Sequence, residues 1–328
     1  MPTNLPPEYY EAEKVYKAAS TPQEKVAALE ELLSTIPKHK GTDHLRADLR
    51  RKLARLKESA ETARKKSGGA VSPYAIDREG AGQVVLLGAA NTGKSSLVRA
   101  LTNAEPEVSP APYSTWSPTP GMMPIENIQV QLIDTPPLSE EFVDPELINL
   151  VRRADLLLLV VDLDTNPLQQ LELTLEILEA NRIVPLELLR GDPQPRFSYP
   201  QALVLGNKCD SPGDEETFEI FCQLLELPLP CLPVSAETGF GVPEFKDAVF
   251  NRLDVIRVYA QPPGREPDFS APFVLPKGAT VLDFARKVHK DVAQNLASAR
   301  LWGSAQFDGQ MVPRDYPLQD GDIVELKT

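Results

Sequence analysis

Short apolar runs alternate with helix-like patterns through the middle of the chain. Five apolar runs predict strands at residues 83–87, 128–133, 156–161, 202–205 and 231–234. Apolar residues at helical spacing predict helices at residues 94–101, 144–153, 168–180, 215–225 and 243–253. Strands that alternate with helices favour a mostly parallel sheet covered on both faces, which makes this an α/β domain. Residues 183–200 fit neither pattern, and the sequence predicts no role for them.

The pattern changes at both ends of this domain. Before a Ser-Gly-Gly break at 67–69, helices are predicted from a capping signature at 21–24 and from leucines three or four residues apart, Leu45, Leu49, Leu53 and Leu56. At the other end, short runs predict strands at 256–259, 273–275, 301–302 and 323–326, with one helix at 280–290. One helix on a small mixed sheet is typical of a ubiquitin-like (β-grasp) α+β domain. We therefore predict a helical segment at 1–69, an α/β domain at 70–254 and an α+β domain at 255–328.

Charge is distributed unevenly along the chain. The 328 residues carry a formal net charge of −13, from 34 Lys and Arg against 47 Asp and Glu. Residues 38–66 contain 11 Lys and Arg against 4 Asp and Glu, a local charge of +7 that leaves −20 for the rest. This basic segment has two interpretations, a solvated amphipathic hairpin or a helix that binds a polyanion such as RNA.

The spacing of the cysteines and the length of the apolar runs indicate which cellular compartment and which class of protein to expect. Cys209, Cys222 and Cys231 show no C-x-x-C spacing, which excludes a disulfide scaffold and disfavours a zinc site. The first residues are acidic and poor in apolar side chains, unlike a signal peptide. The longest apolar run, 156–161, is far below the ~20 residues that span a bilayer. We expect a soluble, cytoplasmic protein with no membrane association.

Residues 88–95, Gly-Ala-Ala-Asn-Thr-Gly-Lys-Ser, match the phosphate-binding pattern G-x-x-x-x-G-K-[ST]. They follow a predicted strand and open a predicted helix, which is the context of a P-loop. The glycines let backbone N–H groups turn towards phosphates, and the helix N-terminus adds a positive field. Lys94 would neutralise the β- and γ-phosphates, and Ser95 would ligate Mg²⁺. We expect the nucleotide to contact Gly88, Asn91, Thr92, Gly93, Lys94, Ser95 and Ser96.

A second motif, Asn207-Lys208-Cys209-Asp210, follows a predicted strand, where a base-reading loop is expected. The carboxylate of Asp210 can accept hydrogen bonds from the ring N–H and the exocyclic amine of guanine. Adenine offers a ring acceptor there and no amine, so such a site can discriminate by ~10⁴-fold or more. After the next strand, Ser235, Ala236 and Glu237 would close over the base from the other side. Together the motifs predict a guanine-nucleotide site.

In this order, the motifs resemble the developmentally regulated GTP-binding protein branch of the Obg-related GTPases. Three further stretches carry the resemblance: residues 34–42 with the following Leu-Arg-Ala-Asp-Leu-Arg-Arg, a switch I-like Pro-Tyr-Ser-Thr at 112–115, and residues 256–326, which resemble a TGS domain. The resemblance covers nearly the whole chain except 183–200. It implies a P-loop GTPase domain followed by a TGS domain, GTP hydrolysis, and association with ribosomes or translation.

The resemblance also implies roles for individual residues. Thr115, or its neighbour Ser114 if the alignment slips by one, would be the second protein ligand of Mg²⁺ beside Ser95, and Asp134 would hold the metal through water. In related GTPases an Asn at the position of Asn91 helps hold a monovalent cation such as K⁺ in place of an arginine finger. The alternative for Asn91 is a turn residue that tolerates unusual backbone angles. The resemblance makes Lys94, Thr115 and Asn91 the expected catalytic residues.

One departure from the family pattern weakens the expected catalysis. The switch II pattern D-x-P-G reads Asp-Thr-Pro-Pro at 134–137. Pro137 has no N–H to donate to the γ-phosphate, and the next residue, Leu138, is not a glutamine that could orient water. Two functions therefore stay open, an active GTPase that regulates engagement with ribosomes or RNA, and a module that senses GTP or GDP with little hydrolysis. The TGS-like domain would serve as a docking surface for protein or RNA.

Overall fold

The computed structural model describes residues 72–104, 117–139 and 143–327, together with five isolated helical positions at 32, 35, 49, 51 and 52. The chain divides into two units, Met1–Ala75 and Ile76–Thr328. The predicted basic helix, residues 34–42 and the switch I stretch lie outside the described residues, apart from those isolated positions. No helix in the described part of the chain is long and apolar enough to span a bilayer.

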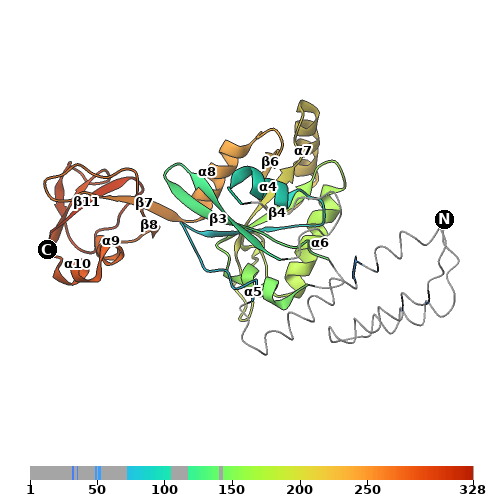
Figure 1. The fold of residues 1–328 in the computed structure, drawn as a ribbon, viewed down its shortest axis with the longest axis horizontal. Helices are drawn as coiled ribbons and strands as arrows, with labels where there is room; N and C mark the ends of the chain where they lie inside the picture. Colours follow the sequence, from blue (N-terminus) through green and yellow to red (C-terminus); the bar gives the residue numbers. More distant parts are fainter. Residues whose placement is uncertain are drawn as a thin grey trace. The chain divides into compact units, whose positions relative to one another are not determined.

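A six-stranded sheet forms the first domain of the second unit (Figure 1). Its strands are β1 (Gln83–Leu87), β2 (Thr119–Ile125), β3 (Ile128–Asp134), β4 (Leu156–Asp162), β5 (Gln201–Asn207) and β6 (Cys231–Val234). They lie in the order β2-β3-β1-β4-β5-β6, and only β2 runs antiparallel to its neighbour. The prediction of a mostly parallel α/β sheet is confirmed.

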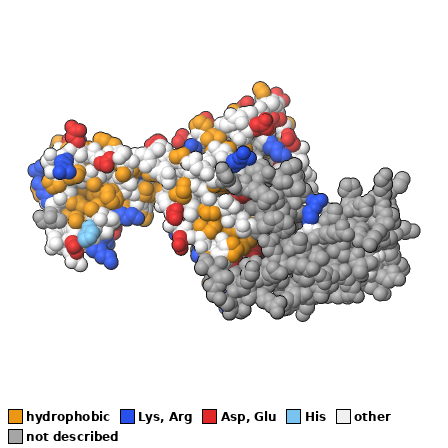
Figure 2. Space-filling view, in the orientation of Figure 1, with side chains coloured by type: hydrophobic (Ala, Val, Ile, Leu, Met, Phe, Trp, Pro, Cys, Tyr) orange, Lys and Arg blue, Asp and Glu red, His pale blue; other side chains and the backbone are white. Residues whose placement is uncertain are grey.

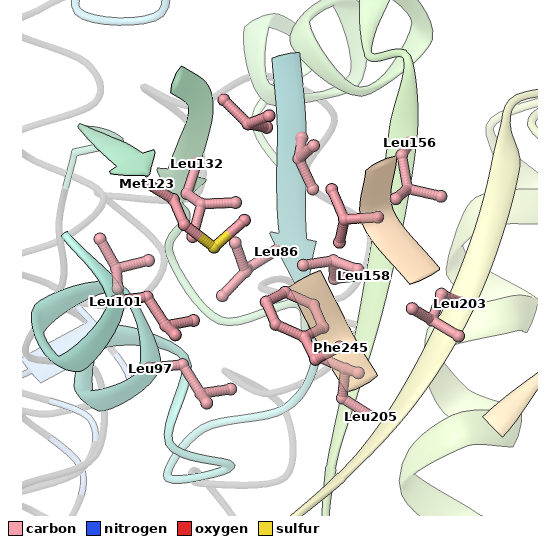
Figure 3. Close-up of a cluster of buried hydrophobic side chains, with 14 of the residues drawn as sticks. Leu86, Leu97, Leu101, Met123, Leu132, Leu156, Leu158, Leu203, Leu205 and Phe245 are labelled. Carbon is pink, nitrogen blue, oxygen red and sulfur yellow. The ribbon is translucent and has the colours of Figure 1, made fainter. Parts of the chain in front are cut away.

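Within residues 72–104, 117–139 and 143–327, five helices cover the sheet: α4 (Lys94–Leu101), α5 (Pro145–Arg153), α6 (Pro167–Ala180), α7 (Pro212–Leu224) and α8 (Val242–Arg252). Alternate strand residues pack with α4 and α8 in one core (Figure 3), which includes Leu86, Leu97, Leu132, Leu158 and Phe245. The residues between them, such as Val85 and Leu157, are fully buried on the opposite face. Burial of both faces fixes the register, so the strand ends that carry the motifs meet at one edge.

Strand β2 was missed because its sequence, Thr-Pro-Gly-Met-Met-Pro-Ile, contains two prolines and a glycine. Proline cannot donate a ladder hydrogen bond, so it argues against a central strand. The structure resolves the conflict by placing β2 at the sheet edge, where β3 is its only partner among the described strands. Met123 and Ile125 of β2 still reach the core.

Residues 183–200, which had no predicted role, form a loop that contacts the start of β5. A short 3₁₀ helix, η1 (Leu186–Leu188), presents Glu187, whose carboxylate accepts the backbone N–H of Ala202 at 3.0 Å. The same carboxylate pairs with Arg252 of α8 at 2.9 Å. An isolated β-bridge between Ile183 and Ser198 joins the two ends of this segment. The segment therefore ties the beginning of β5 to the last turn of α8.

A separate five-stranded mixed sheet forms the C-terminal domain. Its strands are β7 (Val255–Ala260), β8 (Phe273–Pro276), β9 (Ser298–Trp302), β10 (Gln310–Val312) and β11 (Asp322–Lys327), in the order β10-β9-β11-β7-β8. Helix α9 (Val281–Val288) buries Phe284 against this sheet, and α10 (Lys290–Asn295) follows. The helix predicted at 280–290 is present as α9 but ends at Val288, because His289 has extended backbone angles. His289 instead caps α10, a second helix that was not predicted, by accepting the N–H of Asp291.

Candidate nucleotide-binding site

The loop between β1 and α4 is packed tightly against the ends of β4 and β5. A Cβ built on Gly88 would lie 2.3 Å from the carbonyl oxygen of Val160, and one on Gly93 would lie 2.1 Å from Nδ2 of Asn207. Only glycine fits at such distances. Gly93 and Asn91 also have positive φ, of 86° and 65°. These backbone angles belong to a turn and favour the turn-residue interpretation of Asn91.

Lys94 is 5% exposed and opens α4. Its Nζ donates to the carbonyl oxygens of Gly88 at 3.1 Å and Ala89 at 2.7 Å. Burial lowers the pKa of Lys94 to about 8, and the nearby charge of Asp134 partly opposes this shift. The ammonium is therefore desolvated and hydrogen-bonded to two carbonyl dipoles of its own loop. Phosphate oxygens, which are negatively charged, would form stronger hydrogen bonds with it than these carbonyls do.

The residues predicted to hold Mg²⁺ lie together as far as the structure describes them. Ser95 Oγ donates to Asp134 Oδ2 at 2.6 Å, and Asp134 is fully buried at the end of β3. A hydroxyl and a carboxylate are hard oxygen ligands of the kind that Mg²⁺ takes together with nucleotide phosphates. This donor set therefore fits the metal. Thr115 and Ser114 lie outside the described residues, so their role stays a prediction.

Switch II follows Asp134 and turns inward. Thr135 Oγ1 donates to the carbonyl oxygen of Leu86, and both Pro136 and Pro137 are buried. Leu138 is 4% exposed, and its N–H donates to the Gly88 carbonyl oxygen at 3.1 Å. The first N–H after the two prolines is thus used inside the protein. The side chain of Leu138 lies in the core and offers no polar group to a water molecule.

A cleft of about 500 Å³ joins the P-loop to the two motifs that are predicted to read the base. It is lined by Gly93, Ser96, Arg99, Ala100, Asn207, Lys208, Asp210, Ala236 and Glu237. Asn207 Nδ2 donates to the Thr92 carbonyl oxygen at 2.8 Å, which fastens the end of β5 to the P-loop. Asn207 Oδ1 is buried and has no hydrogen-bond partner among the described residues. Residues more than a hundred positions apart in the chain therefore converge on one cleft of nucleotide size.

Asp210 is held in place by residues on both sides of its loop. The fully buried Ser235 donates its Oγ–H to Asp210 Oδ1 and accepts the N–H of Thr238 at 2.8 Å. The N–H groups of Asp210 and Ser211 donate to Asp214 Oδ2 at 3.0 and 2.7 Å. Hydrogen bonds from Ser211 lower the pKa of Asp214. The sequence analysis did not identify Asp214, although the S-x-x-D spacing of a capping box was available as a signal.

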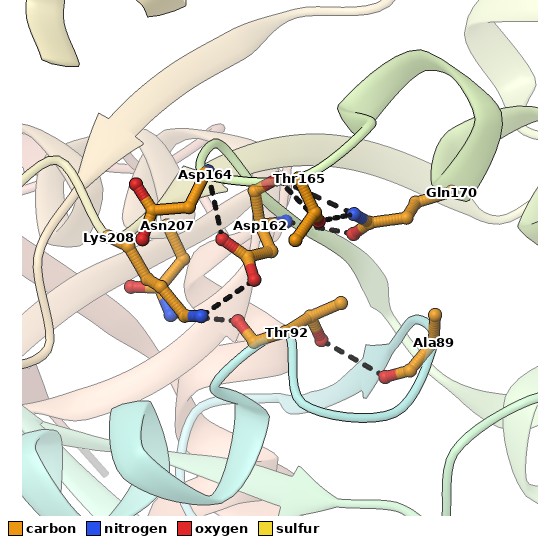
Figure 4. A network of polar contacts seen from close by, with 8 residues as sticks. All are labelled: Ala89, Thr92, Asp162, Asp164, Thr165, Gln170, Asn207 and Lys208. Atoms are coloured by element: carbon orange, nitrogen blue, oxygen red, sulfur yellow. Dashed lines mark hydrogen bonds and ion pairs between the residues drawn. The ribbon is translucent and has the colours of Figure 1, made fainter.

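A second residue that the sequence analysis missed is Asp162, the last residue of β4. Its Oδ2 accepts from Lys208 Nζ at 2.6 Å (Figure 4). An aspartate at the end of an otherwise wholly apolar, buried strand was the available signal, because such a carboxylate needs a partner.

The fold and the converging motifs define a P-loop GTP-binding protein. Residues 83–188 match the family model described as "50S ribosome-binding GTPase", and residues 256–328 match the TGS domain model. An uncharacterized GTP-binding protein of Methanocaldococcus jannaschii is 30% identical over 93% of this chain and 92% of its own length. Developmentally-regulated G-protein 3 of Arabidopsis thaliana is 26% identical, and Ribosome-interacting GTPase 1 of Saccharomyces cerevisiae is 25% identical, each over 94% of this chain and 99% of the relative. The chain belongs to the developmentally regulated GTP-binding protein group of the Obg-related GTPases, with a C-terminal TGS domain.

Proposed function

We propose that this protein hydrolyses GTP to GDP and phosphate and that its nucleotide state regulates association with the ribosome. The observation that carries the proposal is the single cleft in which the P-loop meets Asp210 and Glu237. The loop supplies phosphate binding, and Asp210, held by Ser235, supplies the acceptor for the two donors of guanine.

Each residue of the site has a distinct task in this proposal. Lys94 leaves its loop carbonyls to neutralise the β- and γ-phosphates, and Asn207 keeps the P-loop fastened to β5. Ser95 and Thr115 would ligate Mg²⁺ directly, and Asp134 would hold it through water. Held by these residues, Mg²⁺ would supply positive charge that neutralises the phosphates. Asn91 would hold a K⁺ ion beside the phosphates, in addition to forming the turn.

Water attack on the γ-phosphorus needs a group that positions the water, and switch II supplies none among its described residues. Pro137 has no N–H, and the side chain of Leu138 is in the core. Catalysis by this chain alone would therefore rest on charge stabilisation by Lys94 and by the cations that Ser95 and Asn91 would help to hold. We expect slow intrinsic turnover that a partner accelerates.

Single-turnover hydrolysis tests this function directly. The protein, in excess over radiolabelled GTP, is incubated with Mg²⁺ and K⁺, and the release of phosphate is followed with time. We expect first-order release that is lost in Lys94→Ala, and no release from ATP. GTP that is bound but stays intact would instead support the second candidate, a module that senses GTP or GDP. The feature that favours this second candidate is Pro137.

The ribosome is the partner that the charges favour. In the described residues α7 carries Asp214, Glu215, Glu216 and Glu219, and Figure 2 shows acidic side chains gathered there. Such a surface repels RNA, so the basic segment 38–66 is the expected contact for phosphate groups, with the TGS domain as a second docking surface. The name of the yeast relative supports a ribosomal partner. Three cysteines without a disulfide in the described structure fit a cytoplasmic site of action.

Co-sedimentation with ribosomes at graded salt tests the partner. Affinity for a phosphate backbone falls steeply with salt, because counterions are released on binding. The reversals Arg50→Glu, Arg51→Glu and Arg55→Glu together should abolish association and leave nucleotide affinity unchanged. Association that is independent of salt, or that survives the reversals, would show that this segment is only a solvated face.

A further inference from the structure

The carboxylate of Asp162 is almost completely buried beside the base-reading loop. Its side chain is 6% exposed. Oδ1 accepts the N–H of Asp164 at 3.0 Å, and the N–H of Asp162 itself donates to Gln170 Oε1 at 2.9 Å. Asp162 also lies directly opposite Asn207 in the pairing of β4 with β5. The residue is therefore fixed on every side, and Figure 4 shows its second oxygen directed at Lys208.

Lys208 occupies a position with little freedom of its own. Its φ is 70°, which is unusual for a residue with a side chain. The side chain is 35% exposed, lines the nucleotide cleft beside Asp210, and ends in the 2.6 Å ion pair with Asp162. The ammonium is therefore drawn to the end of β4, and the methylene stem between backbone and ammonium is held along the cleft.

We propose that Asp162 is a positioning residue of the guanine site, which anchors the ammonium of Lys208 so that the lysine stem forms one wall of the base pocket. The stem presents apolar surface to the face of the base, whereas Asp210 reads its edge. An anchored stem loses no further conformational freedom when the base enters, and this preorganisation raises affinity. The inference rests on the proposed guanine-nucleotide function and adds a residue that sets affinity without touching the nucleotide.

The test is the dissociation rate of a fluorescent GDP analogue, chased with unlabelled GDP, from wild type, Asp162→Asn, Lys208→Met and the double variant. Asparagine keeps the shape and can still accept the N–H of Asp164, so Asp162→Asn removes mainly the charge. We expect it to raise the dissociation rate about tenfold, as for the loss of a hydrogen bond to a charged group. Methionine keeps an apolar stem without the ammonium. In the Lys208→Met background, Asp162→Asn should change the rate less than about twofold, because both substitutions break one interaction.

Two controls separate positioning from a general structural effect. Asp164→Asn removes a neighbouring exposed carboxylate and should leave the dissociation rate within about twofold of wild type. Asp162→Asn should accelerate the release of GDP and of inosine diphosphate by the same factor, because in this proposal the stem contacts the face of the base and not its exocyclic amine. Lys208→Met leaves a buried carboxylate unpaired, so if it unfolds at lower temperature, adding Asp162→Asn should restore the melting temperature.

The outcomes distinguish this inference from the function on which it rests. Wild-type protein that binds no GDP contradicts the proposed function. If the wild type binds GDP but Asp162→Asn releases it no faster than Asp164→Asn does, only the inference is contradicted. An equal acceleration by Asp162→Asn in both backgrounds also contradicts it, because Asp162 would then act through the fold and not through Lys208.

Discussion

The two ends of the nucleotide site are built differently. At the base end each reading group is held by a neighbour: Asp210 by Ser235, Asn207 by the Thr92 carbonyl, and Lys208 by a buried carboxylate. At the phosphate end, Lys94 is bound to carbonyls of its own loop, and Pro137 in switch II has no N–H to donate. In the proposed function, recognition of guanine is therefore preorganised, whereas recognition of the γ-phosphate is not.

This contrast predicts where substitutions act. Changes at the base end should alter which nucleotide binds and how tightly, with large effects, because they leave prepared polar groups unpaired. Changes at the phosphate end should have smaller effects on affinity and act mainly on the difference between GTP and GDP or on turnover.

The largest effect should come from Asp210→Asn. The amide can no longer accept both guanine donors, but it can pair with the 2-keto group of xanthine. We expect GTP affinity to fall roughly 100-fold or more while affinity for xanthosine triphosphate rises. Calorimetry with GTP and xanthosine triphosphate measures this change in nucleotide preference, and Asp164→Asn is the matched control. Undiminished GTP binding by the variant would remove Asp210 from the base-reading role.

A smaller effect is expected from Ser235→Ala. The substitution removes a buried hydroxyl that donates to Asp210 and accepts the N–H of Thr238. Loss of a hydrogen bond to a carboxylate should weaken GTP and GDP about tenfold and equally, because both contain guanine. Titration of the two nucleotides by fluorescence checks this. A loss of affinity for GTP alone would show that Ser235 acts on the phosphate end of the site and would contradict the difference proposed between the two ends.

The smallest effect concerns Asn91 and should appear in turnover and not in binding. If Asn91 holds a monovalent ion, GTP hydrolysis should be several-fold faster in K⁺ than in Na⁺ at equal ionic strength. Asn91→Ala should erase that difference and leave GDP affinity nearly intact. Single-turnover rates in both salts decide this, and equal rates for the wild type would leave Asn91 as a turn residue with φ of 65°.

Much of the central domain could be predicted from the sequence because its strands are buried on both faces. The bounds of β1, β6 and α4 match the predicted ranges, and the motifs were placed correctly at strand ends. Strand β2 was missed because an edge position tolerates the prolines that argue against a strand. The partners of Asp162 and Glu187, which are Lys208 and Arg252, could not be predicted because only the fold brings them close in space. The role of Asp214 was missed although its partner Ser211 is only three residues away.

The most direct test of the contrast is the ratio of affinities for a non-hydrolysable GTP analogue and GDP in Mg²⁺, measured for wild type and for Pro137→Gly. A switch II N–H to the γ-phosphate is a charge-assisted hydrogen bond worth roughly 1.5–3 kcal/mol, and proline cannot supply it. We predict that wild type binds the two nucleotides within about tenfold of each other and that Pro137→Gly shifts the ratio towards GTP by about tenfold or more. A wild-type preference for GTP of roughly 100-fold, or a variant with an unchanged ratio, would contradict the account and point to Thr115 as the γ-phosphate sensor.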